Sequence, residues 1–238
     1  MNTTHRGSIR LFRFAGIDVF VHWTWIVVAF LLFEWRWEAG ERLWQAAIYV
    51  SIFAIVLLHE FGHALACRSV GGRADTIVLW PLGGIAFVQP PHRPGAWLWS
   101  IAAGPLVNVA LVPILYLCLM YLGLPEDPAS RSPLQNYVFA LNLINAVLLG
   151  FNLLPIYPLD GGQIVQSILW FFLGFARSLW VAALLGLGCG LAGIAVAGYF
   201  QDWWLVLMAL FVAWRSWEGL LMAREMIRHP SNPRGPVT

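Results

Sequence analysis

The chain has 238 residues, of which 60% are hydrophobic and 11% are charged, and its mean hydropathy is +0.71. This composition argues against a soluble domain and is typical of an integral membrane protein. The net charge of +2 arises from 14 Arg, without any Lys, against 12 acidic residues, so the chain shows no basic footprint for nucleic-acid binding.

Apolar runs along the chain predict about six transmembrane helices, because a helix needs about 20 residues to cross the hydrocarbon core of a bilayer. These runs lie at about residues 19–33, 43–67, 96–122, 136–154, 179–200 and 203–222. A shorter stretch, 162–177, carries Gln163 and Gln166 and either crosses the membrane or lies along its surface. The predicted fold is therefore an all-α polytopic membrane protein, formed by one integral membrane domain over residues 1–238 with a flexible tail at 223–238.

Arginines mark the predicted cytoplasmic side of the membrane, because cytoplasmic loops are enriched in Lys and Arg. They gather before the first run, after the second and in the C-terminal tail: Arg6, Arg10, Arg13, Arg68, Arg73, Arg93, Arg224, Arg228 and Arg234. With six crossings, both termini lie in the cytoplasm. The lack of Lys is compatible with a G+C-rich genome. The expected location is a prokaryotic cell membrane.

Between the second and third predicted helices lies the sequence TIVLWPLGGIAFVQPP, residues 76–91. Two short runs of β-forming residues flank a Pro-Leu-Gly-Gly turn, which predicts a small membrane-associated β-hairpin. Both faces of this hairpin are apolar, which suits strands that dip against the membrane. Neighbouring helices must cover the strands, because unpaired backbone groups cannot face lipid.

The second predicted helix contains the sequence His-Glu-Phe-Gly-His at residues 59–63. Residues four apart lie on one face of a helix, about 6 Å apart along its axis, so His59 and His63 can bind the same ion. Glu60 is poorly placed as a third ligand but can reach a metal-bound water as a general base. Ionisable side chains within a membrane span usually serve a function, which favours a metal site over two histidines hydrogen-bonded in a helical bundle.

A hydrolytic zinc site usually has three protein ligands and one open position for water. The sequence NLLPIYPLDGGQ, residues 152–163, follows the inner end of the fourth predicted helix and offers Asp160 in the same leaflet as the histidines. Pro155 and Pro158 interrupt regular helix there, and the two glycines after Asp160 allow a tight turn. The carboxylate can then point inward, although a solvated aspartate in a Pro- and Gly-containing loop is an alternative.

Further polar residues lie within the predicted helices. Asn142 and Asn145 share one stripe of the fourth helix, where asparagines commonly bond neighbouring helices. Asn152 lies nearest the helix break and either donates to an oxyanion or holds the substrate backbone. Gly104 and Asn108, in the sequence AGPLVN, indicate close packing of the third helix against its neighbours.

Four of these segments together resemble the site-2 protease family of intramembrane zinc metalloproteases, peptidase family M50. HEFGH, PLGG, AGPLVN and NLLPIYPLDGG occur in that family's order within residues 50–165, and four ordered motifs are far more specific than one. The resemblance implies one zinc ion per chain and a three-helix catalytic core at about 43–165, with extra helices around it. It implies that His59, His63 and Asp160 are zinc ligands. It also implies that Glu60 is the catalytic carboxylate and that Asn152 lies near the substrate. Many members carry a PDZ or CBS domain, whereas this chain resembles a short form with neither.

The resemblance also implies hydrolysis of a peptide bond in or near the transmembrane segment of a membrane-protein substrate, with Glu60 as the general base toward a zinc-activated water. Expected partners are single-span or other transmembrane substrates, the lipid bilayer, and either a regulatory membrane partner or a second copy of the chain. The active site is expected within the membrane near its cytoplasmic face. Four residues are expected to help position the substrate: Gly83, Gly84, Pro155 and Pro158.

Two other interpretations of the histidine motif stay open. In a different membrane metalloprotease the third ligand would be a later glutamate, Glu218 or Glu225, although neither has an apolar, inward-facing setting. In a non-proteolytic membrane protein, either a metal transporter or an inactive scaffold, the metal would serve another purpose. His22, in the first predicted helix, is expected to form structural hydrogen bonds rather than to contact a substrate or act in gating.

Overall fold

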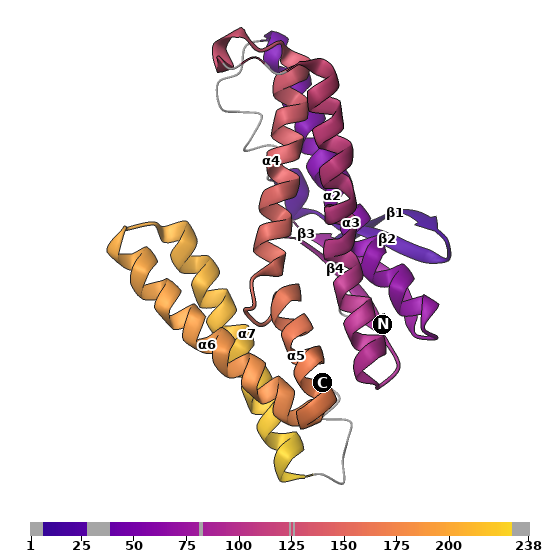
Figure 1. Ribbon diagram of the computed structural model, residues 1–238, viewed down its shortest axis with the longest axis vertical. Helices are drawn as coiled ribbons and strands as arrows, with labels where there is room; N and C mark the ends of the chain where they lie inside the picture. The colour runs from indigo at the N-terminus through magenta and orange to yellow at the C-terminus, as the bar shows by residue number, and fades with distance from the viewer. Residues whose placement is uncertain (1–6, 28–38, 81–82, 124, 126, 230–238) are drawn as a thin grey trace. The chain divides into compact units, whose positions relative to one another are not determined.

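The computed structural model describes residues 7–27, 39–80, 83–123, 125 and 127–229, and Figure 1 shows its helices and strands. The described chain is mostly helical and contains a four-stranded sheet, which confirms the predicted helical membrane fold. By its internal contacts the chain divides into two compact units. The first unit comprises residues 1–91 and 103–150, and the second comprises residues 92–102 and 151–238.

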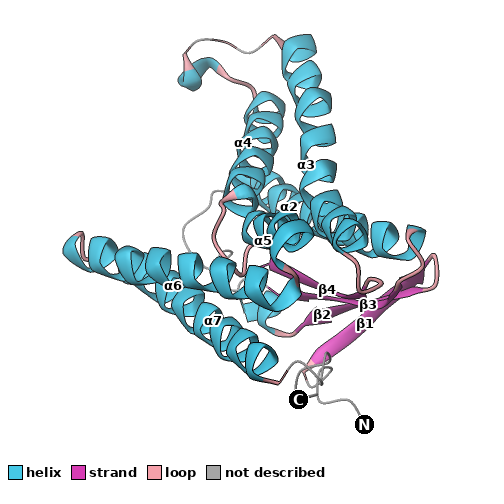
Figure 2. Ribbon diagram, turned by 60° about the horizontal axis from the view of Figure 1, so that its bottom comes forward, coloured by secondary structure: helices cyan, strands magenta, loops and turns pink. Residues whose placement is uncertain are grey.

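The first unit contains a sheet with the strand order β1-β2-β3-β4 (Figure 2). The four strands span Ser8–Phe14, Ile17–His22, Arg73–Trp80 and Gly83–Gln89. β2 and β3 are parallel, whereas β1 and β2, and likewise β3 and β4, are antiparallel. The predicted hairpin is confirmed as β3 and β4, in which Leu79 pairs with Gly84, and the β1–β2 hairpin extends it into a sheet.

The first predicted membrane helix, residues 19–33, is wrong at its start, because β2 occupies Ile17–His22. Alternate side chains of this strand, Ile17 and Val19, are fully buried in the core. A short apolar run that forms a buried strand cannot be told from a helix segment by hydropathy alone. The chain becomes helical only after β2, and residues 28–33 lie outside the described residues.

Helix α2, Ala39–Ser69, connects β2 to β3, so the three elements form a β-α-β unit. The apolar core of the first unit lies between this helix and the sheet. Its buried residues are Ile17, Val19, Val56, Ala64, Cys67, Ala74, Ile77 and Leu79. The histidine motif lies in the C-terminal half of α2, where this packing occurs.

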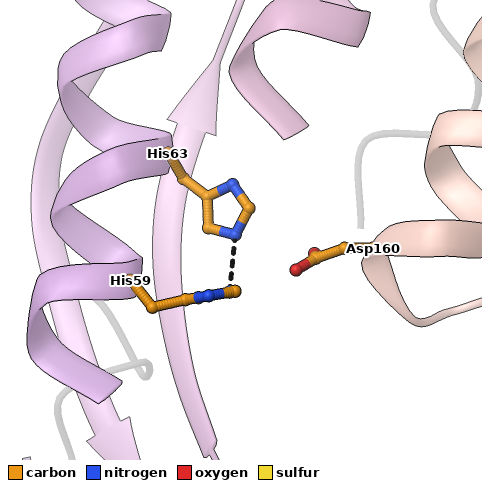
Figure 3. Close-up of side chains that lie close together, drawn as sticks. All are labelled: His59, His63 and Asp160. Atoms are coloured by element: carbon orange, nitrogen blue, oxygen red, sulfur yellow. Dashed lines mark hydrogen bonds between the residues drawn. The ribbon is translucent and has the colours of Figure 1, made fainter. Parts of the chain in front are cut away.

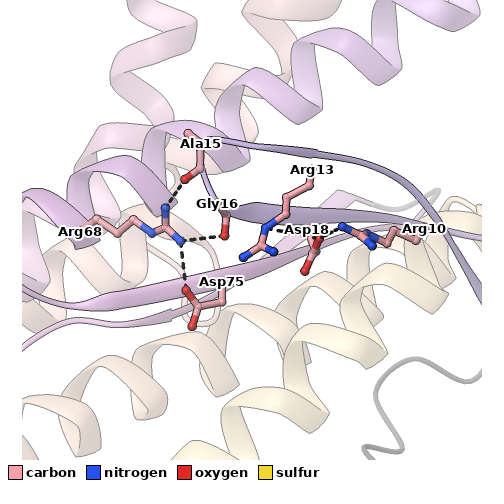
Figure 4. A network of polar contacts seen from close by, with 7 residues as sticks. All are labelled: Arg10, Arg13, Ala15, Gly16, Asp18, Arg68 and Asp75. Atoms are coloured by element: carbon pink, nitrogen blue, oxygen red, sulfur yellow. Dashed lines mark hydrogen bonds and ion pairs between the residues drawn. The ribbon is translucent and has the colours of Figure 1, made fainter.

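Arg68, in the last turn of α2, forms hydrogen bonds with both hairpins (Figure 4). Its guanidinium donates to the backbone oxygens of Ala15 and Gly16, in the turn between β1 and β2, and to Asp75 Oδ1 of β3 at 3.0 Å. These contacts hold the β1–β2 hairpin at the C-terminal end of α2. Two ion pairs also join β1 to β2: Arg10–Asp18 at 2.6 Å and Arg13–Asp18 at 3.9 Å.

Two long helices and a short 3-10 helix follow the sheet. They are α3, Pro94–Leu122, η2, Pro128–Ser130, and α4, Pro133–Leu153. α2 and α3 approach closely at Gly62, where an added Cβ would lie 2.6 Å from the backbone oxygen of Ala103. Large side chains such as Leu117 and Tyr121 are exposed on α3, as expected of a helix surface that faces lipid.

The second unit contains the last three helices. They are α5, Asp160–Leu173, α6, Phe175–Tyr199, and α7, Trp203–Arg228. α6 and α7 lie side by side (Figure 1 and Figure 2). They approach closely at Gly190, where an added Cβ would lie 2.8 Å from the backbone nitrogen of Ala213.

Five helices among the described residues are long and apolar enough to cross a membrane. They are Leu43–Ser69, Pro94–Leu122, Pro133–Leu153, Phe175–Tyr199 and Trp203–Arg228. These helices match the second to sixth predicted runs. The shorter stretch predicted at 162–177 corresponds to α5, whose 14 residues give a length of about 21 Å, less than the roughly 30 Å of a hydrocarbon core.

Candidate metal centre

Three ionisable side chains of α2 are buried where the helix packs on the sheet. His59 and His63 are 6% exposed, and Glu60 is 5% exposed. The Nε2 atoms of the two imidazoles are 3.1 Å apart. Two bonds of about 2.0–2.1 Å to a tetrahedral zinc ion place their nitrogens roughly 3.3 Å apart. The histidine pair therefore fits one zinc ion, as the four-residue spacing predicts.

The other ring nitrogen of His59 faces α3. His59 Nδ1 lies 2.6 Å from Oδ1 of Asn108. The Asn108 amide nitrogen donates to Oδ1 of Asn145 in α4 at 2.8 Å, and the Asn145 amide nitrogen donates to the backbone oxygen of Asn108 at 3.0 Å. Both amides are fully buried. The predicted interhelical role of Asn145 is confirmed, whereas the contact of Asn108 with a histidine of the motif was missed.

Gly104 makes room for the second histidine. A Cβ added at this position would lie 2.2 Å from Nε2 and 2.4 Å from Cε1 of His63. The predicted close packing of α3 is therefore confirmed, and the neighbour that requires it is an imidazole of the motif. Gly104 and Asn108 are four residues apart and share one helix face. The histidines have the same spacing on α2, and each of the two α3 residues contacts one of them.

The carboxylate of Glu60 contacts strand β4. The backbone N–H of Ala86 donates to Glu60 Oε2 at 2.8 Å. A Cβ added at Gly84 would lie 2.3 Å from Cγ and 2.5 Å from Oε1 of Glu60, so only glycine lets the strand pass so close. Gly84 of the PLGG motif therefore lies against the carboxylate of the histidine motif.

Asp160 is the first residue of α5, in the second unit. The two glycines after it let the first turn of α5 lie against the connection from α4. A Cβ at Gly161 would lie 2.4 Å from the backbone oxygen of Leu153, and a Cβ at Gly162 would lie 2.3 Å from the backbone nitrogen of Tyr157. The glycines thus serve close backbone approach at the predicted turn.

Helices α6 and α7 hold the connection that precedes Asp160. Ser216 Oγ donates to the backbone oxygen of Tyr157 at 2.7 Å, and a Cβ at Gly186 would lie 2.4 Å from the same oxygen. Burial raises the pKa of the Tyr157 phenol, while nearby Arg215 opposes this rise and Glu218 adds to it. The phenol therefore stays neutral at ordinary pH.

Figure 3 shows the side chains of His59, His63 and Asp160 close together. Each offers one ligand atom, and these atoms all lie within 4.8 Å of one another. Imidazole nitrogens and a carboxylate oxygen are ligands that zinc binds, and three such ligands leave a position for water. The donor set therefore fits a zinc ion.

The remaining predicted site residues lie close to these elements in the sequence. Asn152 is half-buried in the last turn of α4, and Pro155 and Pro158 lie in the connection to α5, where they interrupt helix as predicted. Gly83 and Gly84 begin β4. The roles of these residues toward a substrate stay predictions.

The two later glutamates do not belong to this group of ligands among the described residues. Glu218 Oε2 pairs with Arg215 on its own helix at 2.5 Å, and both side chains are more than 40% exposed. Glu225 is exposed. Neither setting resembles that of a buried metal ligand.

His22 ends β2 and is buried. Its ring stacks on Trp80, with centroids 3.9 Å apart, and its Nδ1 lies 2.8 Å from the hydroxyl of Thr24. These contacts agree with the structural hydrogen bonding expected of His22.

The chain is similar to known proteins over most of its length. The model of peptidase family M50 matches residues 47–126 and 122–185. A zinc metalloprotease of Methanocaldococcus jannaschii is 31% identical over 205 residues, which cover 86% of this chain and 58% of that protein. The protein Rip3 of Mycobacterium tuberculosis is 30% identical over 230 residues, which cover 87% of this chain and 57% of that protein.

A solved structure has a similar fold. The site-2 protease from Methanocaldococcus jannaschii aligns with a TM-score of 0.63 and 27% identity, covering 90% of this chain and 95% of that chain. The chain belongs to peptidase family M50, which confirms the family indicated by the four motifs, and it is an integral membrane protein. It spans 57–58% of the length of the two curated relatives named above.

Proposed function

We propose that the chain is an intramembrane zinc metalloprotease that hydrolyses a peptide bond in or near the transmembrane segment of a membrane-protein substrate. One observation carries the proposal: in a chain of family M50, one helix buries two imidazoles with Nε2 atoms 3.1 Å apart beside a buried carboxylate. We propose His59, His63 and Asp160 as the ligands of one zinc ion per chain. Their ligand atoms all lie within 4.8 Å of one another, which supports this assignment.

Zinc bound at this site would lower the pKa of a water molecule and polarise the peptide carbonyl. The protons would be moved by Glu60. Its carboxylate accepts a proton from the water as the water oxygen bonds to the carbonyl carbon, and returns the proton to the amide nitrogen as the C–N bond breaks. The products are a carboxylic acid and an amine. Asn152 would donate its amide N–H to the oxyanion or to the substrate backbone.

The edge strand β4 would bind the substrate in an extended form. A helical substrate hides its carbonyl groups in hydrogen bonds, so a segment of it must unwind before hydrolysis. Among the described strands, β4 pairs with β3 alone, and an extended peptide can add to its other edge. The hydrogen bond from Ala86 to Glu60 brings the general base to this strand. The residues proposed to position the substrate are Gly83, Gly84, Pro155 and Pro158.

The active site would lie within the membrane near its cytoplasmic face. The C-terminal ends of α2 and α7 carry Arg68 and Arg228, and arginines are enriched on that side. Because Arg68 bonds the β1–β2 turn, the N-terminal hairpin would lie on the same side as the end of α2. Both termini would then be cytoplasmic, and the chain would meet its substrate in the bilayer.

Replacing Glu60 by Gln tests the proposed function most directly. The variant should retain one zinc ion per chain and lose cleavage of a single-span substrate by about 10²–10⁴-fold or more, because the general base is removed. Metal analysis and cleavage in vesicles measure the two quantities. Glu218→Gln, at a carboxylate paired with Arg215, is the matched control and should keep both. Undiminished cleavage by the Glu60 variant, or a wild-type protein that binds no zinc, would overturn the proposal.

Substrate addition at β4 has its own test. Ile85 is 50% exposed on β4, whereas Ile9 is 58% exposed on β1, the opposite edge of the sheet. In the Glu60→Gln background, Ile85→Cys should form a disulfide with a cysteine placed near the cleavage site of the substrate. The control Ile9→Cys should not form this disulfide. Equal cross-linking from both edges would contradict strand addition at β4.

A further inference from the structure

A chain of hydrogen bonds runs from α4 through α3 to the imidazole of His59. The last acceptor in this chain determines which atom donates at each step. The last acceptor is the backbone oxygen of Asn108, and a carbonyl oxygen can only accept. The Asn145 atom that lies 3.0 Å from it is therefore the amide nitrogen. Consequently Oδ1 of Asn145 is the atom that faces the side chain of Asn108.

The orientation of Asn145 also fixes the orientation of Asn108, which contacts the histidine. Since Oδ1 of Asn145 accepts, the Asn108 atom 2.8 Å from it is the amide nitrogen, and Oδ1 of Asn108 faces His59 Nδ1 at 2.6 Å. This oxygen also accepts, so Nδ1 must carry the proton. In a neutral imidazole Nε2 then keeps its lone pair, and Nε2 is the nitrogen that lies 3.1 Å from Nε2 of His63.

We propose that Asn108 and Asn145 are positioning residues for the metal, which fix His59 in the tautomer and ring orientation that present Nε2 to the ion. The functional meaning of this inference rests on the zinc site proposed above, whereas the tautomer follows from the hydrogen bonds themselves. Metal-bound histidines commonly donate their other N–H to a partner, and loss of that partner typically costs 10–100-fold in metal affinity. Here the partner is a neutral amide that a second helix orients in turn.

Burial makes the alternative arrangement costly. If the Asn108 amide flipped, its oxygen would face Oδ1 of Asn145; if both amides flipped, Oδ1 of Asn145 would face the backbone oxygen of Asn108. Either flip leaves two acceptors in contact without a proton between them. Both side chains are 0% exposed, so water cannot relieve this contact, and a buried polar group without its hydrogen bond is destabilising. The chain thereby disfavours the tautomer with a proton on Nε2, which cannot bind metal through Nε2.

The tautomer can be read directly from the metal-free protein. In ¹⁵N-histidine-labelled protein, the His59 signals are assigned as those that are absent in the His59→Gln variant. Their nitrogen chemical shifts should show a protonated Nδ1 and an unprotonated Nε2. In Asn108→Leu the same ring should move toward the other tautomer or a mixture. A wild-type His59 protonated on Nε2 would overturn the inference.

Zinc affinity tests the serial arrangement of the two amides. Asn108→Leu should weaken zinc binding, measured by competition with a chelator, by about 10–100-fold. Asn145→Leu should weaken it less, and should add nothing in the Asn108→Leu background, because Asn145 acts through Asn108. The matched control is Asn142→Leu, three residues earlier in α4, because the amide nitrogen of Asn142 has no hydrogen-bond partner among the described residues. This control should bind zinc as the wild type does.

A conservative variant separates positioning from folding. Asn108→Asp keeps an acceptor toward His59 and should bind zinc more tightly than Asn108→Leu, and thermal unfolding of the metal-free variants shows which of them still fold. The positioning role would be overturned if Asn108→Leu bound zinc as tightly as the wild type. It would also be overturned if Asn145→Leu weakened zinc binding equally in the wild type and in the Asn108→Leu background. If the wild type binds no zinc, the proposed function fails instead, and the ¹⁵N shifts still decide the tautomer.

Discussion

The two units of the molecule hold their candidate ligands by different kinds of contact. In the first unit, neighbouring groups touch the imidazoles themselves. Asn108 Oδ1 lies 2.6 Å from a ring nitrogen of His59, and the backbone of Gly104 borders the ring of His63 so closely that a Cβ would lie 2.2 Å from Nε2. The direction of each imidazole therefore depends on single atoms of α3.

In the second unit, two contacts act on the backbone that leads to Asp160. Ser216 bonds the backbone oxygen of Tyr157, and Gly162 lies against the Tyr157 backbone nitrogen. The difference follows from ligand chemistry, because an imidazole binds metal through one of two unlike nitrogens, whereas a carboxylate has two equivalent oxygens. Changes around the imidazoles should therefore alter metal affinity sharply, and changes around Tyr157 more gradually.

Removing one candidate ligand from each unit should reduce zinc binding most, and it tests whether both units serve one ion. His63→Ala and Asp160→Ala should each weaken zinc binding by more than the roughly 10–100-fold that loss of a ligand's hydrogen-bond partner costs, because each removes one of the three proposed protein ligands. Metal analysis and chelator competition measure the loss. Asp75→Ala, at an aspartate 74% exposed, is the control and should keep its zinc. Unchanged zinc in Asp160→Ala would show that the second unit holds no ligand.

A smaller change tests how closely α3 controls the imidazole of His63. Gly104→Ala places a methyl group 2.2 Å from Nε2 of His63, so the imidazole must move, and zinc affinity should fall by about 10–100-fold without loss of any ligand. Gly188→Ala in α6 is the matched control, because its Cβ meets nothing within 4 Å. This control should leave zinc affinity unchanged and gain up to about 1 kcal/mol of helix stability. Equal zinc affinities in the two variants would contradict direct control of His63 by α3.

Local signals in the sequence predicted much of this arrangement. The four-residue spacing of His59 and His63 is a property of one helix, and the PLGG turn between β-forming runs is a property of one hairpin, so both could be derived without tertiary structure. β2 was mistaken for a membrane helix, because a buried strand and a helix segment have the same hydropathy. Hydropathy also gave no sign that the N-terminal strands extend the hairpin into a sheet.

Contacts between distant segments could not be derived in the same way. His59 and Asn108 are 49 residues apart, and Tyr157 and Ser216 are 59 residues apart. Asn108 and Gly104 were predicted to pack closely, but nothing in the sequence specifies which helix face they meet. No motif in the sequence marks Ser216 in α7. A buried serine in a helix can bond a carbonyl of its own helix, so its type does not predict a bond to a distant segment.

Loss of the Ser216 hydrogen bond should have a smaller effect, and it tests the contact that acts on the backbone before Asp160. Ser216→Ala leaves the backbone oxygen of Tyr157 without its 2.7 Å hydrogen bond, which costs about 1 kcal/mol or more and loosens the connection to Asp160. Zinc affinity should fall only about 5-fold, since the carboxylate can still reach the ion from a less ordered backbone. Ser178→Ala is the matched control, because that buried hydroxyl bonds Phe175 within α6, and zinc affinity should not change. A loss in Ser216→Ala as large as that in Gly104→Ala would mean that both units control their ligands equally sharply.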